Sequence, residues 1–116
     1  MKHLIAIFLA STAFAGTFAI LPTGSMHPAI SAKGALVSYE PCAFAQVKAG
    51  DIILFKRPGF SHGFAFSVVC HRVVKVVKFA SGDTALVTKG DNNSSKYPGY
   101  VCAEDFVGVV TSIRNN

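Results

Sequence analysis

Short apolar runs separated by turn-forming residues make up most of the chain beyond Pro22. Glycine, proline, aspartate and asparagine bound each run, and the runs themselves are rich in valine, isoleucine and phenylalanine. This alternation is typical of β-strands joined by turns, and it indicates no helix in this part of the chain. We therefore predict a mainly β fold, a small antiparallel β domain, with strands over residues 35–39, 52–56, 65–79, 85–89 and 106–113.

An uncharged stretch of 18 residues, 4–21, precedes this domain and follows Lys2. About 20 apolar residues cross a bilayer as a helix, so we expect residues 1–21 to be a single N-terminal transmembrane anchor and residues 22–116 the β domain. Lys2 marks the cytoplasmic end, which places the domain on the extracytoplasmic side. The alternative is a cleaved secretory signal, because residues 13–15 (AFA) have the small-x-small form of a cleavage site.

Composition narrows the range of partners. Apolar residues make up 51% of the chain and charged residues 15%, which excludes a disordered protein. The net charge is +5, but no run of lysine and arginine is longer than two, so we expect a lipid membrane as partner and no nucleic acid. Cys42, Cys70 and Cys102 form no C-x-x-C pair, so we expect neither a metal nor another cofactor. In an extracytoplasmic domain two of them could form one disulfide and leave one thiol free, and buried free thiols are an equal alternative.

Three polar segments interrupt the apolar pattern. Ser25 lies in a glycine- and proline-rich turn, His71 lies inside the most apolar run, and Asp91 lies in a turn at a strand end. Each has a structural explanation by itself: a turn serine, a half-buried histidine, a turn aspartate. Histidine is nevertheless the side chain whose ordinary pKa, about 6.5, suits a general base near neutrality. His62, in a glycine-flanked loop, is not expected to be essential.

Local geometry connects His71 with Asp91. Residues 80–83 (ASGD) indicate a hairpin turn between the runs on either side. A four-residue loop there pairs residues whose numbers sum to about 163, which puts His71 opposite a residue near 92. The hairpin therefore predicts that Asp91 comes within reach of His71, where a carboxylate can orient a catalytic imidazole.

Five segments resemble the type I signal peptidases, the S26 family of serine peptidases, in order and in spacing. The resemblance implies a membrane-anchored, mostly β enzyme that removes signal peptides from exported preproteins after small-x-small residues. It implies Ser25 as the nucleophile, and His71 as the general base in place of lysine, as in the archaeal and endoplasmic-reticulum branch. It also implies an oxyanion hole made by the Thr23 hydroxyl and the Ser25 N–H. The segments are TGSMHP (23–28), GDIILF (50–55), HRVV (71–74), KGDNN (89–93) and DFVG (105–108).

The sequence departs from the family at one position. His-type members carry a further aspartate about six residues after the position of Asp91, and this chain has Tyr97 there. The acid is therefore Asp91, which we predict, or Asp105 from a neighbouring strand, or absent. Its absence would fit a catalytically inactive relative that binds exported chains or membrane partners. A self-cleaving repressor-type protein is disfavoured, because such proteins use a lysine base and lack an export segment.

Overall fold

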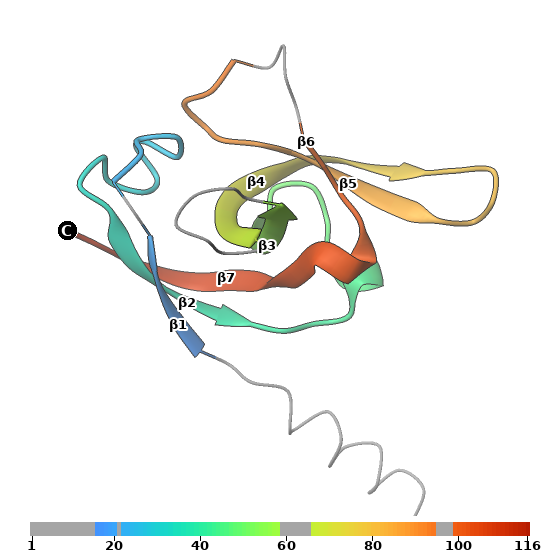
Figure 1. Cartoon of the computed structure of the whole chain (residues 1–116), viewed down its shortest axis with the longest axis horizontal. Coiled ribbons are helices and arrows are strands. Elements are labelled where there is room, and N and C mark those ends of the chain that lie inside the picture. Colours follow the sequence, from blue (N-terminus) through green and yellow to red (C-terminus); the bar gives the residue numbers. More distant parts are fainter. Residues whose placement is uncertain (1–15, 21, 59–65, 95–98) are drawn as a thin grey trace, which may run out of the picture.

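The computed structural model describes residues 16–20, 22–58, 66–94 and 99–116 (Figure 1). The candidate cleavage site at residues 13–15, together with His62 and Tyr97, lies outside these ranges. All strand pairs of the described chain are antiparallel, in one sheet of order β1-β2-β7-β3-β4-β5-β6. The strands are β1 (Gly16–Ile20), β2 (Ala35–Glu40), β3 (Ile52–Pro58), β4 (Phe66–Lys78), β5 (Thr84–Lys89), β6 (Gly99–Val101) and β7 (Phe106–Asn115).

The five predicted strands are confirmed as β2, β3, β4, β5 and β7. Two 3₁₀ helices, η1 (Phe44–Gln46) and η3 (Ala103–Asp105), were not predicted, and neither was the three-residue strand β6. Elements this short carry too few residues to show a period in the sequence. They form because their neighbours supply partners: Tyr100 of β6, for example, pairs with Val87 of β5.

The expectation of a transmembrane helix over the uncharged stretch 4–21 is wrong for residues 16–20. Gly16–Ile20 is strand β1, which pairs along its whole length with β2, from Gly16 opposite Tyr39 to Ile20 opposite Ala35. Thr, Phe and Ile favour strands as readily as they favour apolar helices, so pairing with β2 decides the conformation. Within the described residues, no helix is long and apolar enough to cross a membrane.

The β4–β5 hairpin projects beyond the rest of the sheet (Figure 1). Lys78 pairs with Thr84 at the turn, close to the predicted register. Val74 has no partner on β5, because Val73 pairs with Thr88 and Lys75 with Val87. This bulge shifts the register by one more residue. Arg72 consequently pairs with Lys89, two positions before the predicted partner.

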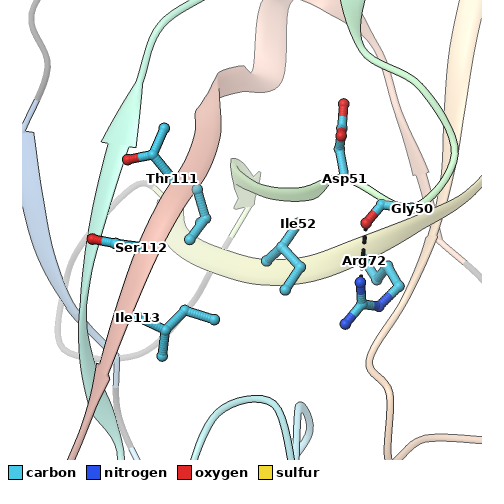
Figure 2. A pocket seen from close by; sticks show the side chains of 8 residues that line it. Gly50, Asp51, Ile52, Arg72, Thr111, Ser112 and Ile113 are labelled. Carbon is cyan, nitrogen blue, oxygen red and sulfur yellow. Dashed lines mark hydrogen bonds between the residues drawn. The ribbon is translucent and has the colours of Figure 1, made fainter.

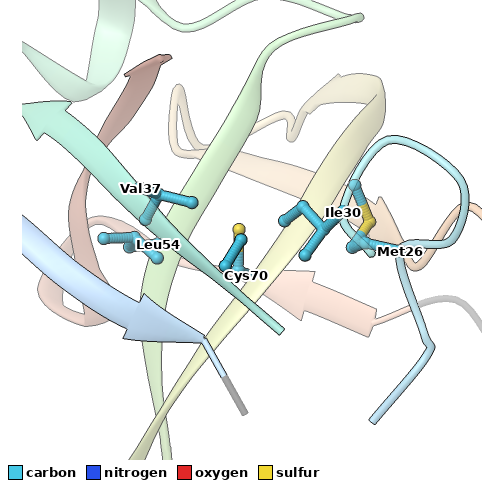
Figure 3. Close-up of a cluster of buried hydrophobic side chains, with 6 residues drawn as sticks. Met26, Ile30, Val37, Leu54 and Cys70 are labelled. Atoms are coloured by element: carbon cyan, nitrogen blue, oxygen red, sulfur yellow. The ribbon is translucent and has the colours of Figure 1, made fainter. Parts of the chain in front are cut away.

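Two hydrophobic clusters hold the sheet together. Residues of β3 and β4 contribute to them alternately, one residue to the first cluster and the next to the second. Leu54 and Cys70, paired across these strands, lie in the first cluster, shown in Figure 3. Met26 and Ile30 reach this cluster from the loop before β2 (Figure 3). The second cluster contains Val47, Ile53, Phe55, Val73, Leu86 and Val101. Because strand side chains alternate between the two faces of a sheet, consecutive residues of β4 belong to different clusters.

Candidate active site

The Ser25 turn is anchored by its neighbour Met26, whose side chain is only 2% exposed. The chain turns at Gly24, whose φ of 77° lies in the left-handed region that favours glycine. The His27 N–H donates to the Gly24 carbonyl at 3.1 Å and closes the turn. Burial of Met26 therefore fixes the backbone on which Ser25 is carried, while the Ser25 residue itself stays accessible.

The Thr23 side chain lies beside Ser25. The Thr23 hydroxyl donates to Ser25 Oγ over 3.2 Å, and the Ser25 N–H donates to Thr23 Oγ1 over 3.3 Å. Both bonds are long for their type, so little energy is lost when either donor turns to another acceptor. The hydroxyl and N–H that we expected in an oxyanion hole thus occupy one small region.

The turn after β5 packs directly on the Ser25 turn. The Asn92 N–H donates to the Ser25 carbonyl at 2.8 Å, and Asn92 Nδ2 donates to the Gly24 carbonyl at 3.2 Å. The Asp91 N–H points at Met26 Sδ, 3.3 Å away. A Cβ on Gly90 would lie 2.6 Å from the Ser25 carbonyl oxygen, so glycine is needed for this close approach. Two segments more than sixty residues apart in sequence therefore form one surface.

Asp91 is bound by Arg72 of strand β4. Arg72 Nε and Nη2 donate to the two carboxylate oxygens at 2.8 and 2.9 Å, and Nη1 donates to the Gly50 carbonyl at 3.0 Å. The bonds from Arg72 to the carboxylate hold the pKa of the Asp91 carboxyl below its usual value of 3.8. The fork geometry is specific to arginine and ties the turn after β5 to the middle of the sheet. The carboxylate is therefore ionised throughout the neutral range.

His71 follows Cys70 and precedes Arg72 on β4, so it projects from the opposite face to both. It pairs with Ile53 of β3, and its ring is half-buried. Burial and the positive charge of Arg57 lower the pKa of His71 below 6.5, and Lys89 acts in the same direction. The charge of Asp91 opposes them and raises the pKa. The neutral imidazole, which is the form that accepts a proton, is therefore favoured.

Contacts among the described residues connect the predicted site residues in pairs, but none of them joins Ser25 to His71. Thr23 contacts Ser25 directly, the Asp91 turn contacts the Ser25 turn, and Asp91 lies within electrostatic reach of His71. Asp105, at the end of η3, is not among the charges that act on His71 within the described residues.

Sequence reasoning did not identify Arg72 as the partner of Asp91, nor Asn92 as the contact to the Ser25 turn. An arginine directly after the histidine, and an asparagine directly after the aspartate, were the available signals.

A pocket of about 280 Å³ lies beside this region (Figure 2). Arg72 is common to both, since its guanidinium lines the pocket and also holds Asp91. The pocket brings together the turn before β3 and one stretch of β7, and no residue of the Ser25 turn lines it. Its lining residues are Gly50, Asp51, Ile52, Arg72, Val110, Thr111, Ser112 and Ile113.

All three cysteines are free thiols, and the one beside His71, Cys70, is not an alternative nucleophile. Burial, followed by the charge of Asp91, raises the pKa of Cys70 to about 12, so its reactive thiolate is suppressed. The described residues contain no group of three histidine, cysteine or acidic side chains that could hold a metal ion.

The chain is similar to a catalytic subunit of the signal peptidase complex, SEC11C. The proteins of Homo sapiens, Canis lupus familiaris and Pongo abelii are each 35% identical to it over 74 residues, which is 64% of this chain. The match covers 35% of each relative, so the chain spans about a third of the length of the curated relatives it matches. No family model matches the chain. The similarity supports a relationship to the signal peptidases.

Proposed function

We propose that this chain is a serine endopeptidase that removes signal peptides, or similar N-terminal segments, from exported proteins after small-x-small residues. The observation that carries the proposal is the contact between the Ser25 turn and the Asp91 turn, made by the two Asn92 hydrogen bonds. Through this contact the Ser25 turn bonds to the Asp91 turn. The Arg72–Asp91 ion pair in turn joins the Asp91 turn to β4, the strand that carries His71. The similarity to SEC11C, a catalytic subunit by its name, supports the same activity.

The proposed reaction is acyl transfer through Ser25. His71 takes the proton from Ser25 Oγ while that oxygen attacks the scissile carbonyl carbon. The resulting oxyanion accepts hydrogen bonds from the Thr23 hydroxyl and the Ser25 N–H, which give up their present bond partners. His71 then protonates the leaving amine, and the C–N bond breaks. A water molecule, deprotonated by His71, then attacks the acyl carbon; the ester C–O bond breaks, and His71 returns the proton to Ser25 Oγ. One oxyanion-hole donor typically contributes about 3 kcal/mol to such a transition state.

Asp91 has an electrostatic role in this proposal. Because both of its oxygens accept hydrogen bonds from Arg72, we assign its effect on His71 to its negative charge. That charge favours the imidazolium, which forms when His71 takes the serine proton. We also place the domain on the extracytoplasmic side of a membrane, since an anchor and a cleaved leader would both export it.

A catalytically inactive relative that binds exported chains or membrane partners is the second candidate. The observation in its favour is that Arg72 binds the carboxylate that a triad would direct at His71. Such a protein would bind a preprotein through the same surface and leave it intact.

Incubation of the purified full chain with a preprotein that carries an Ala-x-Ala cleavage site tests the proposal. We expect cleavage after the second alanine, and a loss on the order of 10⁴-fold or more for Ser25→Ala and for His71→Ala. Ser81→Ala is the matched control, because its hydroxyl lies in the exposed β4–β5 turn and, among the described residues, bonds to Asp83 two positions later. Full activity of Ser25→Ala would overturn the assignment of the nucleophile. Binding without cleavage by the wild type would favour the inactive relative.

A further inference from the structure

The imidazole of His71 packs against the ring of Phe55 on the neighbouring strand. His71 pairs with Ile53, so Ile53 and Phe55, two residues apart on β3, project from the same face as His71. The centroids of the Phe55 and His71 rings lie 6.1 Å apart with an angle of 64° between their planes. This edge-to-face arrangement lies within the favourable range for aromatic pairs. Phe55 is only 2% exposed, so its packing limits where the imidazole can lie.

Arg57 lies over the ring of Phe55. It follows Phe55 by two residues, so it extends from the same face of β3. Its guanidinium carbon lies 5.5 Å from the centroid of the Phe55 ring, which is a cation–π distance. A Cβ on Gly99 would come within 3.0 Å of Arg57 Nη2, so the first residue of β6 leaves the space that the guanidinium needs. Arg57 is exposed, and its guanidinium lies beside both Phe55 and the start of β6.

We propose that Arg57 is a positioning residue for His71, which holds the Phe55 ring against the imidazole and provides a positive charge that keeps the imidazole neutral. The effect runs through the Phe55 ring and through the charge of Arg57. The inference rests on the proposed function only for its catalytic consequence. The placement of Arg57, Phe55 and His71 stands without it.

The charges around His71 come from three elements. Arg57 on β3 and Lys89 at the end of β5 are positive, and Asp91 in the following turn is negative. Arg57 has the largest effect of the three on the pKa of His71, which it lowers, after the effect of burial itself. Lys89 is held by the carbonyls of Gly90 and Asn93, at 2.8 and 2.7 Å. Arg57 is therefore the charge whose removal should change His71 most.

The consequence of losing Arg57 depends on pH. Without its charge, the pKa of His71 rises, so a smaller fraction of the imidazole is neutral on the acid side of the transition. Activity that needs the neutral base then falls at acid pH and is retained at alkaline pH. An Arg57→Lys variant keeps the charge but loses the planar group that covers the ring.

NMR titration of the His71 imidazole in the full chain tests the proposal without any need for activity. The resonance is assigned by its loss in His71→Ala. We expect Arg57→Gln to raise the titration midpoint of His71 and to change its ring-current shift, and Arg57→Lys to restore the midpoint but not the shift. Arg114→Gln is the matched control. Arg114 lies five residues along β7 from Val109, the residue paired with Ile53, so it is roughly 16 Å further along the sheet.

The pH dependence of kcat/KM provides the second measurement. Below pH 6.5 we expect Arg57→Gln to lose a factor of about 2–10 in kcat/KM, as one unit charge acting through partly solvated space would produce. Its KM should be unchanged. Gly99→Ala, which pushes the guanidinium aside but keeps its charge, should change the ring-current shift and leave the midpoint nearly as in the wild type. A His71 midpoint and shift that stay the same in Arg57→Gln would overturn the inference. An altered midpoint in a chain that cleaves nothing would support it and contradict the proposed function instead.

Discussion

At the scale of single residues, Asp91 differs most from the expectation of a simple triad. The hairpin does bring it near His71, but the carboxylate is bound in two places by the guanidinium of the adjacent Arg72. An arginine fork satisfies a carboxylate better than a single imidazole N–H can, because it donates two parallel, charge-assisted hydrogen bonds. The ion pair is partly exposed, with side-chain exposures of 34% for Arg72 and 21% for Asp91. Its contribution to stability is therefore modest.

Asp91→Asn separates the catalytic role from the structural one. If the Asp91 charge acts on His71 as proposed, turnover should fall by a factor of about 2–10, as the loss of one unit charge acting through partly solvated space would produce. Stability should fall by only about 1 kcal/mol, because the amide still accepts one hydrogen bond from Arg72. Asp105→Asn is the control and should leave turnover unchanged. Loss of turnover in Asp105→Asn alone would place the acid in η3, and loss of stability without loss of turnover would make Asp91 purely structural.

The same variant has a defined effect on acid stability. The pKa of Asp91 is lowered in the folded protein, so its contribution to stability is present above the usual value of 3.8 and is lost as pH falls through the folded value. Between neutral pH and about pH 2, the melting temperature of the wild type should therefore fall further than that of Asp91→Asn. Equal losses in thermal scans of the two proteins would contradict this account of the ion pair.

At the scale of elements, the site depends on two turns that touch. The Ser25 turn precedes the main sheet in sequence, and the turn of residues 90–93 follows β5. Gly90 makes the contact close, because any side chain there would meet the backbone oxygen of Ser25. A backbone atom cannot move aside as a flexible side chain can. The separation of the two turns is therefore sensitive to one methyl group.

Gly90→Ala should move the two turns apart. A Cβ placed 2.6 Å from the Ser25 oxygen forces a shift, and a displacement near 1 Å at a catalytic group can cost about 10² in rate. Gly82→Ala is the control. Gly82 has a φ of 93°, and a Cβ added to it would meet nothing within 4 Å, so alanine there should cost roughly 1–2 kcal/mol of stability through backbone strain. Its turnover per folded molecule should match the wild type, whereas Gly90→Ala with normal turnover would show that the contact is not needed.

At the scale of the whole molecule, β1 competes with a membrane span for the same residues. With Gly16–Ile20 paired to β2, only residues 4–15 remain of the uncharged stretch. As a full helix these twelve residues would extend about 18 Å, well short of the roughly 30 Å hydrocarbon core. The stretch before the A-x-A sequence, residues 4–12, instead has a length typical of the apolar part of a secretory signal.

We therefore expect the mature, exported protein to begin at Gly16. Mass spectrometry of the N-terminus, made separately on the soluble and membrane fractions of cells that produce the full chain, would measure this. A membrane-bound protein that retains residues 1–15 would contradict the expectation. It would also require β1 to leave the sheet, which a loss of protection from hydrogen exchange at residues 16–20 would reveal.

The five longer strands and the hairpin between residues 78 and 84 were predictable from the sequence. The sequence also singled out Thr23, Ser25, His71 and Asp91, whose catalytic roles stay predictions. Apolar runs, turn residues and motif spacing act over a few neighbouring residues, so they can be recognised without a partner. Pairing across the sheet decided the rest: β1 as a strand, the bulge at Val74, Arg72 as the partner of Asp91, and the stack of Arg57 and Phe55 on His71. Each of these depends on how strands pair with their neighbours, and these contacts exist only once the sheet has formed.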